Sequence, residues 1–208
     1  MRIEKITRSE KISDRYYLEF EDGTRIKADI AQIADYSLYT GRELTDDEYE
    51  SLCEDAALTS AKKRSLRILG SRNMSRREMT TRLVQKGEDA ETARETAEWL
   101  ASIGAINDEE YARMIVRHYE AKGYGIARIK DELYKRGIER DMWEAALEEF
   151  SGTDDAAYSF LERKLRGDVA DKDEIRRATN ALYRRGFSWG DINSALTRYI
   201  NDIEDADS

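Results

Sequence analysis

The chain of 208 residues contains 44 acidic and 35 basic residues, one histidine, one cysteine and no proline. One cysteine excludes an internal disulfide and a cysteine-based zinc cage, and one histidine excludes histidine-pair metal motifs, so we expect neither a metal nor a cofactor. The net charge of −9 disfavours nucleic acid as the main partner, and no apolar run is long enough for a membrane span, which favours a cytoplasmic protein.

The first part of the chain is predicted to form strands. Residues 16–20 and 26–30 alternate apolar and polar side chains, which is the period of a strand with one buried face. Between them, Asp22-Gly23 supplies the positive φ angles of a tight hairpin turn. Residues 3–6 indicate a further short strand, and residues 31–40 indicate a short helix.

A long helix is predicted to begin after Thr45. Thr45 and Glu48 have the spacing of a capping box, in which each side chain accepts a hydrogen bond from the other residue's backbone amide. Apolar residues then recur every three or four positions from Tyr49 to Ala57, a pattern typical of an amphipathic helix. We expect this helix to continue to Leu69 and to link the N-terminal segment to a region that is helical throughout, in keeping with the absence of proline.

An internal repeat is centred on three glycines. Gly87, Gly137 and Gly186 lie 50 and 49 residues apart, and a basic residue precedes each one. Relative to each glycine, apolar residues recur at positions −8, −4, +6, +10 and +13. These residues are Met79, Leu83, Ala93, Ala97 and Leu100 in the first repeat, Ile129, Leu133, Trp143, Leu147 and Phe150 in the second, and Ala178, Leu182, Ile192, Leu196 and Tyr199 in the third. The spacing predicts two amphipathic helices joined at a left-handed glycine.

A third helix is expected before each pair. Capping patterns at Ser75–Glu78, Asn107–Glu110 and Asp171–Glu174 indicate helix starts. Glycines that close the helices stand at Gly104, Gly123 and Gly167. The predicted fold is therefore mainly α, an elongated, curved array of three tandem three-helix repeats with a small N-terminal segment that contains a β-hairpin. The expected boundaries are 1–58 for the N-terminal segment and linking helix, then 59–106, 107–152 and 153–208 for the three repeats.

The sequence contains no recognisable catalytic constellation. His118, the one candidate imidazole base, lies in a helix between basic and aromatic residues and is interpreted as a partly exposed surface residue. Cys53 falls on the apolar stripe of the linking helix, where an inert thiol is expected. Neither a P-loop nor a dinucleotide-binding loop is present. We therefore predict that the protein is not an enzyme.

Most of the aromatic residues are predicted to pack in the core. Trp143, Phe150 and Tyr199 occupy apolar positions of the repeat, and Phe187 and Trp189 are expected to pack at a helix start. Tyr124 stands between two glycines in the second repeat, where burial is harder to arrange. It is the aromatic side chain that we expect to be exposed.

Positive charge is concentrated in one stretch of this acidic chain. Residues 61–87 contain nine basic residues and one acidic residue, whereas residues 1–55 and 88–150 each sum to −7. The stretch is either an ordinary solvated helix face or a basic patch that meets an acidic protein surface or a phosphate backbone. Segregation of the charges favours the second interpretation, because mixed signs suffice for solubility.

Three stretches of the helical region carry a family resemblance. Residues 75–87 read SRREMTTRLVQKG, residues 103–113 read IGAINDEEYAR, and residues 122–138 read KGYGIARIKDELYKRGI. In order, spacing and repetition they resemble the first repeat, the link and the second repeat of the RecX regulatory proteins. Residues 182–187, LYRRGF, extend the match more loosely into the third repeat.

The resemblance implies a helical modulator of the bacterial RecA recombinase. Members of the RecX family bind RecA as a monomer and as a filament, with single-stranded DNA present as part of the filament. They restrain filament growth, ATP hydrolysis, strand exchange and co-protease activity, which implies a role in homologous recombination, regulation of DNA repair and the SOS response. No membrane partner is implied, and we expect a monomer.

Candidates for partner contact follow from charge and placement rather than from the family motif. They are Arg72, Arg76, Arg77, Arg82, Lys86, Arg113, Arg117, Tyr124, Arg128, Lys130, Lys135 and Arg136. Two alternatives stay open: a helical protein that binds DNA directly, and a helical scaffold for an unrelated protein partner.

Overall fold

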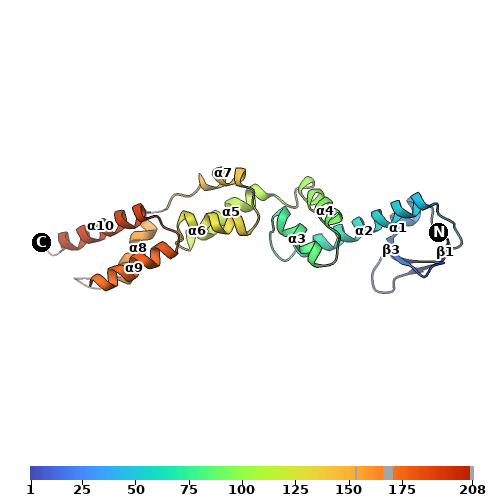
Figure 1. Cartoon of the computed structure of the whole chain (residues 1–208), viewed down its shortest axis with the longest axis horizontal. Coiled ribbons are helices and arrows are strands. Elements are labelled where there is room, and N and C mark those ends of the chain that lie inside the picture. The colour runs from blue at the N-terminus through green and yellow to red at the C-terminus, as the bar shows by residue number, and fades with distance from the viewer. Residues whose placement is uncertain (153, 166–170, 207–208) are drawn as a thin grey trace. The chain divides into compact units, whose positions relative to one another are not determined.

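The computed structural model describes residues 1–152, 154–165 and 171–206. The chain divides into two compact units, Met1–Ile106 and Asn107–Ser208 (Figure 1). The first contains a small sheet and the first three-helix repeat, and the second contains the other two repeats. The predicted mainly helical fold, with three tandem three-helix repeats and an N-terminal β segment, is confirmed. The elongated curvature and the domain boundaries stay predictions.

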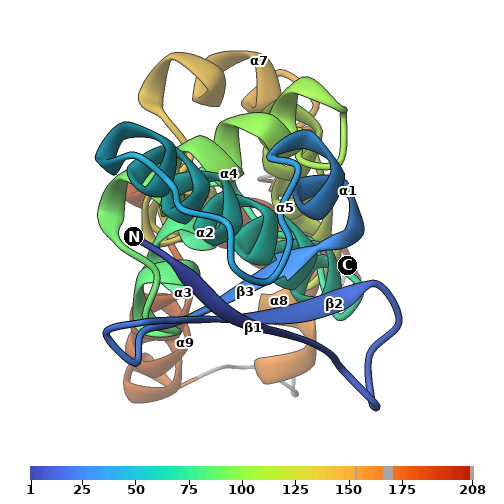
Figure 2. The same ribbon diagram turned by 90° about the vertical axis from the view of Figure 1, so that its right-hand side faces the viewer.

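Three antiparallel strands form the N-terminal sheet in the order β1-β2-β3, at β1 (Ile3–Arg8), β2 (Arg15–Phe20) and β3 (Arg25–Asp29). Leu18 pairs with Ile6 on one side and with Ile26 on the other, so the alternation read from the sequence places apolar residues on one face. Leu18 and Phe20 are fully buried on that face. Figure 2 shows the three strands side by side, with α1 and α2 on one side of the sheet.

Helix α1 (Ile30–Asp35) is shorter than the predicted 31–40 helix. It ends because Ser37 adopts a positive φ of 47°. The chain then reverses so that the amide of Leu38 donates to the carbonyl of Ile33 at 2.8 Å. Leu38 is thereby buried in the core of the sheet rather than on a helix face.

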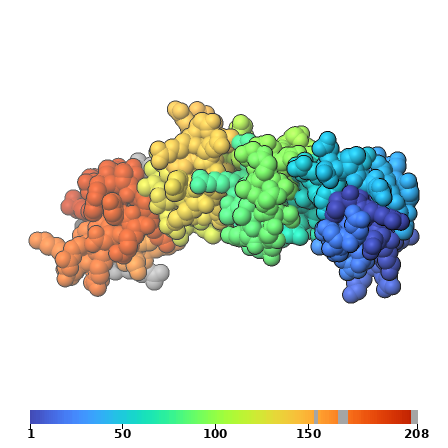
Figure 3. All heavy atoms as spheres, turned by 45° about the vertical axis from the view of Figure 1, so that its right-hand side comes forward, coloured from blue at the N-terminus to red at the C-terminus, as the bar shows by residue number. Residues whose placement is uncertain are grey.

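Helix α2 (Asp46–Leu69) begins with the predicted capping box at Thr45 and runs unbroken to Leu69. Its first half buries Leu52 against the sheet. Its second half is the first helix of repeat one, followed by α3 (Arg76–Gln85) and α4 (Ala90–Ser102). Atoms of the sheet (dark blue) and of α2 (cyan) adjoin in Figure 3. A single helix therefore packs against the sheet with its first half and belongs to the first repeat with its second half.

The repeat pattern holds throughout the core of repeat one. All five predicted apolar positions are buried there. The capping box at Ser75 is complete, since Ser75 and Glu78 each accept from the other's backbone amide. Gly87 joins α3 to α4 with a φ of 93°, a left-handed conformation that residues with a Cβ rarely adopt.

Repeat two departs from the predicted pattern in its last helix. It contains α5 (Asp108–Ala121), α6 (Ile126–Lys135), the 3-10 turn η1 (Arg140–Met142) and α7 (Trp143–Leu147). The expected helix through Phe150 is wrong, because the chain leaves α7 to place Ser151 on α5. There the amide and hydroxyl of Ser151 both donate to Glu120, at 2.9 and 3.1 Å. Phe150 still packs, partly buried, against the repeat core.

Repeat three contains α8 (Asp154–Lys164), α9 (Lys172–Arg184) and α10 (Trp189–Ala206). The capping box predicted at Asp171 is wrong, because the side chain of Asp171 forms no cap. Its backbone carbonyl accepts from the amides of Glu174 and Ile175. A reciprocal cap that was not predicted joins Ser188 and Asp191 at the start of α10. The predicted helix end at Gly167 lies outside the described residues.

Repeats two and three meet backbone to backbone within the second unit. The amide of Gly125 donates to the carbonyl of Arg185 at 2.9 Å, and the amide of Ala127 donates to the carbonyl of Gly186 at 3.1 Å. Helix α6 has no side-chain cap at Gly125, so two of its orphan N-terminal amides are satisfied by the neighbouring repeat. A Cβ built on Gly125 would lie 2.3 Å from the oxygen of Gly186. Both glycines are required for this approach.

Candidate partner-binding surface

The basic residues of α3 and of its flanking turns differ in how free they are. Arg77, Arg82 and Lys86 are exposed and form no ion pair with any described residue. Arg72 is bound by Glu78, with both terminal nitrogens 3.1 Å from one carboxylate oxygen. Arg76 is half-buried and interacts within the chain. The available positive charge of this helix therefore lies at positions 77, 82 and 86.

Two predicted contact residues on α5 belong to an ion network. Arg117 donates to Glu110 at 2.7 Å and to Glu149 at 3.0 Å. These hydrogen bonds raise the pKa of the Arg117 guanidinium, and the bond from Arg117 holds the pKa of the Glu110 carboxyl below its usual value. Arg113 lies 3.5 Å from the same Glu149. Both arginines thus connect α5 to the segment after α7, and a partner would compete with these carboxylates.

Arg136 has an internal role. Its Nε donates to Glu132 at 3.0 Å, and one terminal nitrogen donates to the hydroxyl of Tyr111 at 2.7 Å. Burial by itself would raise the pKa of the Glu132 carboxyl, but hydrogen bonds from Arg136 and Tyr119 lower it. The buried carboxylate is therefore kept charged by its partners. Arg136 stabilises repeat two rather than presenting a free charge.

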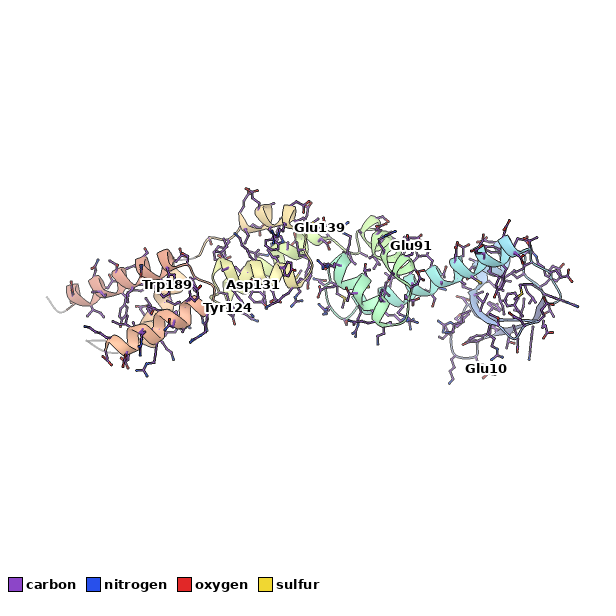
Figure 4. All side chains as sticks on the ribbon, in the orientation of Figure 1. Glu10, Glu91, Tyr124, Asp131, Glu139 and Trp189 are labelled. Carbon is purple, nitrogen blue, oxygen red and sulfur yellow. The ribbon has the colours of Figure 1, made fainter. Side chains whose placement is uncertain are left out.

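Tyr124 is half-buried, so the expectation that it is exposed is wrong. Its ring centroid lies 5.4 Å from that of Tyr119, and the guanidinium of Arg185 lies 5.4 Å from its ring. Figure 4 shows Tyr124 where α6 approaches repeat three. A residue of the next repeat covers the ring, which a reading of repeat two alone could not reveal.

Helix α6 presents three further cations of the predicted contact set. Lys130 and Lys135 are exposed, and Arg128 is half-buried; none of the three is paired with a carboxylate of the described residues. Between the two lysines lies Tyr134, which is 62% exposed. An exposed tyrosine between lysines is the kind of side chain that anchors protein interfaces.

The same position is exposed in every repeat. Three residues before each central glycine stand Val84, Tyr134 and Tyr183, which are 45%, 62% and 55% exposed. A basic residue lies within two positions of each. The repeat pattern of buried residues does not include this position, because −3 lies next to the buried −4 stripe. Its signal was an apolar residue at −3 in all three repeats.

Repeat three adds a second exposed aromatic to this position. Trp189 is 51% exposed and stacks on Tyr183, with centroids 5.4 Å apart and planes 22° apart. Figure 4 labels Trp189 at the start of α10. The predicted packing at this helix start is confirmed for Phe187, which is buried, and is wrong for Trp189.

The described residues offer no metal site. No group of three or more histidine, cysteine or acidic side chains is placed to hold a metal ion within 1–152, 154–165 and 171–206. His118 is exposed beside Tyr119. Cys53 is half-buried, and burial raises the pKa of its thiol, which makes it a poor nucleophile. None of the described helices is long and apolar enough to cross a membrane.

The helical part of the chain matches three family models. Residues 61–100 match the first three-helix domain of RecX, residues 107–147 the second and residues 153–196 the third. A regulatory protein RecX of Xanthomonas campestris pv. campestris (strain B100) is 33% identical over 144 residues, which cover 68% of this chain and 87% of that relative. The chain belongs to the RecX family of regulatory proteins.

More distant RecX proteins extend the similarity to the N-terminal sheet. A regulatory protein RecX of Caldanaerobacter subterraneus subsp. tengcongensis is 25% identical over 199 residues, which cover 94% of this chain and 98% of that relative. A crystal structure of regulatory protein RecX matches at a TM-score of 0.71 and 20% identity, covering 97% of this chain and 98% of that one. RecX from Lactobacillus salivarius matches at a TM-score of 0.62 over 69% of this chain and 96% of that one. These structures share the fold.

The exposed −3 residues all lie within the matched RecX domains. Val84 belongs to the first domain, Tyr134 to the second and Tyr183 to the third. The N-terminal sheet precedes all three matched ranges. The sheet therefore lies outside the part of the chain that carries the exposed −3 residues.

Proposed function

We propose that the chain binds the RecA recombinase and its filament on single-stranded DNA and restrains filament growth, ATP hydrolysis, strand exchange and co-protease activity. Membership of the RecX regulatory family supports this function. The observation that carries the proposal to particular residues is the exposed apolar side chain at −3 in every repeat, flanked by cations. The protein acts by binding and performs no covalent chemistry.

The chemistry of the −3 surface suits an acidic protein partner. Tyrosine supplies a large apolar ring and a polar tip at low cost in conformational entropy, and such residues dominate the energetics of interfaces. The flanking cations, Lys130 and Lys135 in repeat two, steer an acidic partner toward the ring. Arg82 and Lys86 flank Val84 in the same way. The proposed contact is therefore an aromatic or aliphatic anchor within a basic rim.

Repetition of the surface explains how weak contacts can suffice. A filament offers the same subunit surface many times, and three repeats in one chain raise the effective concentration of each contact once one has formed. Binding to neighbouring subunits obstructs their exchange and rearrangement. Restraint of growth and of ATP hydrolysis then follows without an active site.

The test is ATP hydrolysis by RecA on single-stranded DNA with substoichiometric amounts of this protein. We expect the wild-type protein to reduce the rate and to sediment with preformed filaments. Tyr134→Ala removes the anchor of repeat two, and Tyr39→Ala is the matched control because both rings are 62% exposed. Loss of one interface tyrosine should raise the half-inhibiting concentration about tenfold, with no change for the control.

Two results would contradict the proposal. No effect of the wild-type protein on ATP hydrolysis, together with no sedimentation on filaments, would favour a scaffold for another partner. If Tyr134→Ala and Tyr39→Ala inhibit ATP hydrolysis equally well, the −3 surface is not the contact with RecA. RecA binding would then depend on another surface of the chain. Circular dichroism spectra that match wild type show that each variant is folded.

A further inference from the structure

Two adjoining hollows lie where the N-terminal sheet meets α2. The larger, of about 450 Å³, is lined by five cations: Arg15 of β2, Lys27 of β3, Arg64 and Arg67 of α2, and Lys86 at the end of α3. The smaller, of about 220 Å³, shares Arg15 and Lys27 with it. We call this lining the basic groove. It joins strands to helices that lie far apart in the sequence.

Most of the positive charge in the basic groove is uncompensated. Of its five cations only Arg64 pairs with a carboxylate of the described residues, at 3.1 Å from Glu88. Arg67 donates from Nε to a backbone carbonyl of its own helix, which leaves its charge unneutralised. Two carboxylates line the smaller hollow. Asp29 is bound by Lys63 at 3.0 Å, and Asp14 accepts a hydrogen bond from the hydroxyl of Ser13 at 3.3 Å. The chain has a net charge of −9, yet no carboxylate of the described residues forms an ion pair with the other four cations.

We propose that the basic groove binds the sugar-phosphate backbone of single-stranded DNA, independently of base sequence. Four cations gathered around a hollow create a positive potential that attracts a polyanion. Arginine forks bind phosphate through two parallel hydrogen bonds, and lysine binds it as a point charge. Arg15 and Lys27 place part of this site on the N-terminal sheet, before the first matched RecX domain. Arg64, Arg67 and Lys86 lie within that domain, and Lys86 is the one residue that the groove shares with the −3 surface.

The lining favours a phosphate backbone over an acidic protein. Protein interfaces depend on aromatic or aliphatic anchors in the middle of the contact. The larger hollow has one aliphatic side chain, Ile68, and no aromatic residue in its lining. Cations and the hydroxyl of Ser60 make up the rest of the lining of this larger hollow, and contacts of this kind to phosphate carry no sequence preference.

The concave shape favours a single strand over a duplex. The two hollows share Arg15, Lys27 and Ser60, so they form one recessed path along the sheet and α2. A flexible single strand can follow such a path. Duplex DNA stays stiff over about 150 base pairs and cannot enter a recess of this size.

Fluorescence anisotropy with a labelled oligothymidine and the full chain tests the proposal without any recombinase. Engagement of the four free cations predicts a slope of log affinity against log salt of about −3. The double variant Arg15→Ala, Lys27→Ala should bind at least tenfold more weakly at low salt, with a slope flatter by about 1.4. Lys5→Ala, Lys11→Ala is the matched control, since it removes the same charge from exposed residues of the same segment that line neither hollow.

The outcomes separate this site from the proposed function. Equal loss in the two double variants would overturn the groove and leave only a net-charge effect. Tight binding of a duplex with the same dependence on Arg15 and Lys27 would overturn the single-strand assignment. A defect in RecA inhibition with unchanged DNA binding would make the groove a protein site and also overturn it. Arg67→Ala, on α2 and outside the −3 surface, gives a second variant of the groove should the sheet variant unfold.

Discussion

The backbone contact between repeats two and three makes Gly125→Ala the sharpest structural prediction. Gly125 has a φ of −81°, which alanine adopts without strain, so any cost of this substitution comes from its surroundings. Its Cβ would lie 2.3 Å from the oxygen of Gly186 and 2.5 Å from the nitrogen of Phe187. Both atoms are backbone and cannot move as a flexible side chain would.

The size of the effect follows from the two ways in which the protein can respond. If the backbone shifts while the repeats stay docked, overpacking costs about 1–3 kcal/mol. If the repeats separate, the two hydrogen bonds from the amides of Gly125 and Ala127 are lost, at about 1 kcal/mol each. Either response costs about 2 kcal/mol. For a unit of this size that corresponds to a fall in Tm of roughly 8 °C or more.

Thermal unfolding and amide hydrogen exchange measure this effect at different levels. Far-UV circular dichroism reports the unfolding of all helices, of which α5 to α10 belong to the second unit. Exchange at residues 125 and 127 reports the contact itself, and a loss of about 2 kcal/mol should accelerate it roughly 30-fold. Gly70→Ala is the matched control, because Gly70 has a φ of −59° and its nearest neighbour to a Cβ is 3.6 Å away. We expect the control to change stability by less than about 0.5 kcal/mol.

One result would refute the reasoning. If Gly125→Ala unfolds like the wild type and retains slow exchange at residues 125 and 127, the two backbones are not in contact. A loss of equal size in Gly70→Ala would instead show that the helix ends, and not the repeat junction, respond to the change.

Further predictions concern the core, a helix cap and a tyrosine. Leu133→Ala removes a fully buried side chain of repeat two. It should lower the free energy of unfolding, measured in urea, by about 2–5 kcal/mol. A loss below about 1 kcal/mol would place Leu133 outside the core. Ser75→Ala breaks the capping box of α3 and should cost about 1 kcal/mol in the same assay, whereas Ser75→Asp, which restores a cap, should recover most of it. The hydrogen bond from Tyr36 to Asp55 raises the pKa of the Tyr36 phenol from 10.0 to about 12. The contribution of this hydrogen bond to the free energy of unfolding is therefore present below pH 10 and is lost as the pH rises toward 12. Absorbance titration at alkaline pH should therefore lose one late-titrating phenol in Tyr36→Phe.

The periodic part of the fold could be read from the sequence. Gly87, Gly137 and Gly186 all adopt the positive φ that the repeat required, and the −8 and −4 residues before them are buried in every repeat. The caps at Thr45 and Ser75 also formed as predicted. Each of these features depends on residues within a few turns of one another, and such local interactions leave a regular pattern in the sequence.

The sequence did not show which cations are free and which are bound within the chain. Arg117 and Arg136 were predicted to be available to a partner, yet Glu149 and Tyr111 bind them from other elements. Tyr124 read as exposed, yet Arg185 covers it from the next repeat. The partners lie 25 to 61 residues away in the chain, and no periodicity connects them.

Sequence alone determined which residues form helices, where the glycine turns fall and which faces are apolar, because hydrogen bonding and burial along one helix repeat every few residues. Tertiary structure decided where α7 ends, which arginines stay free and how Arg15 and Lys27 join α2 and α3 in the basic groove. Those outcomes depend on distances between elements that only the packing of the folded chain sets.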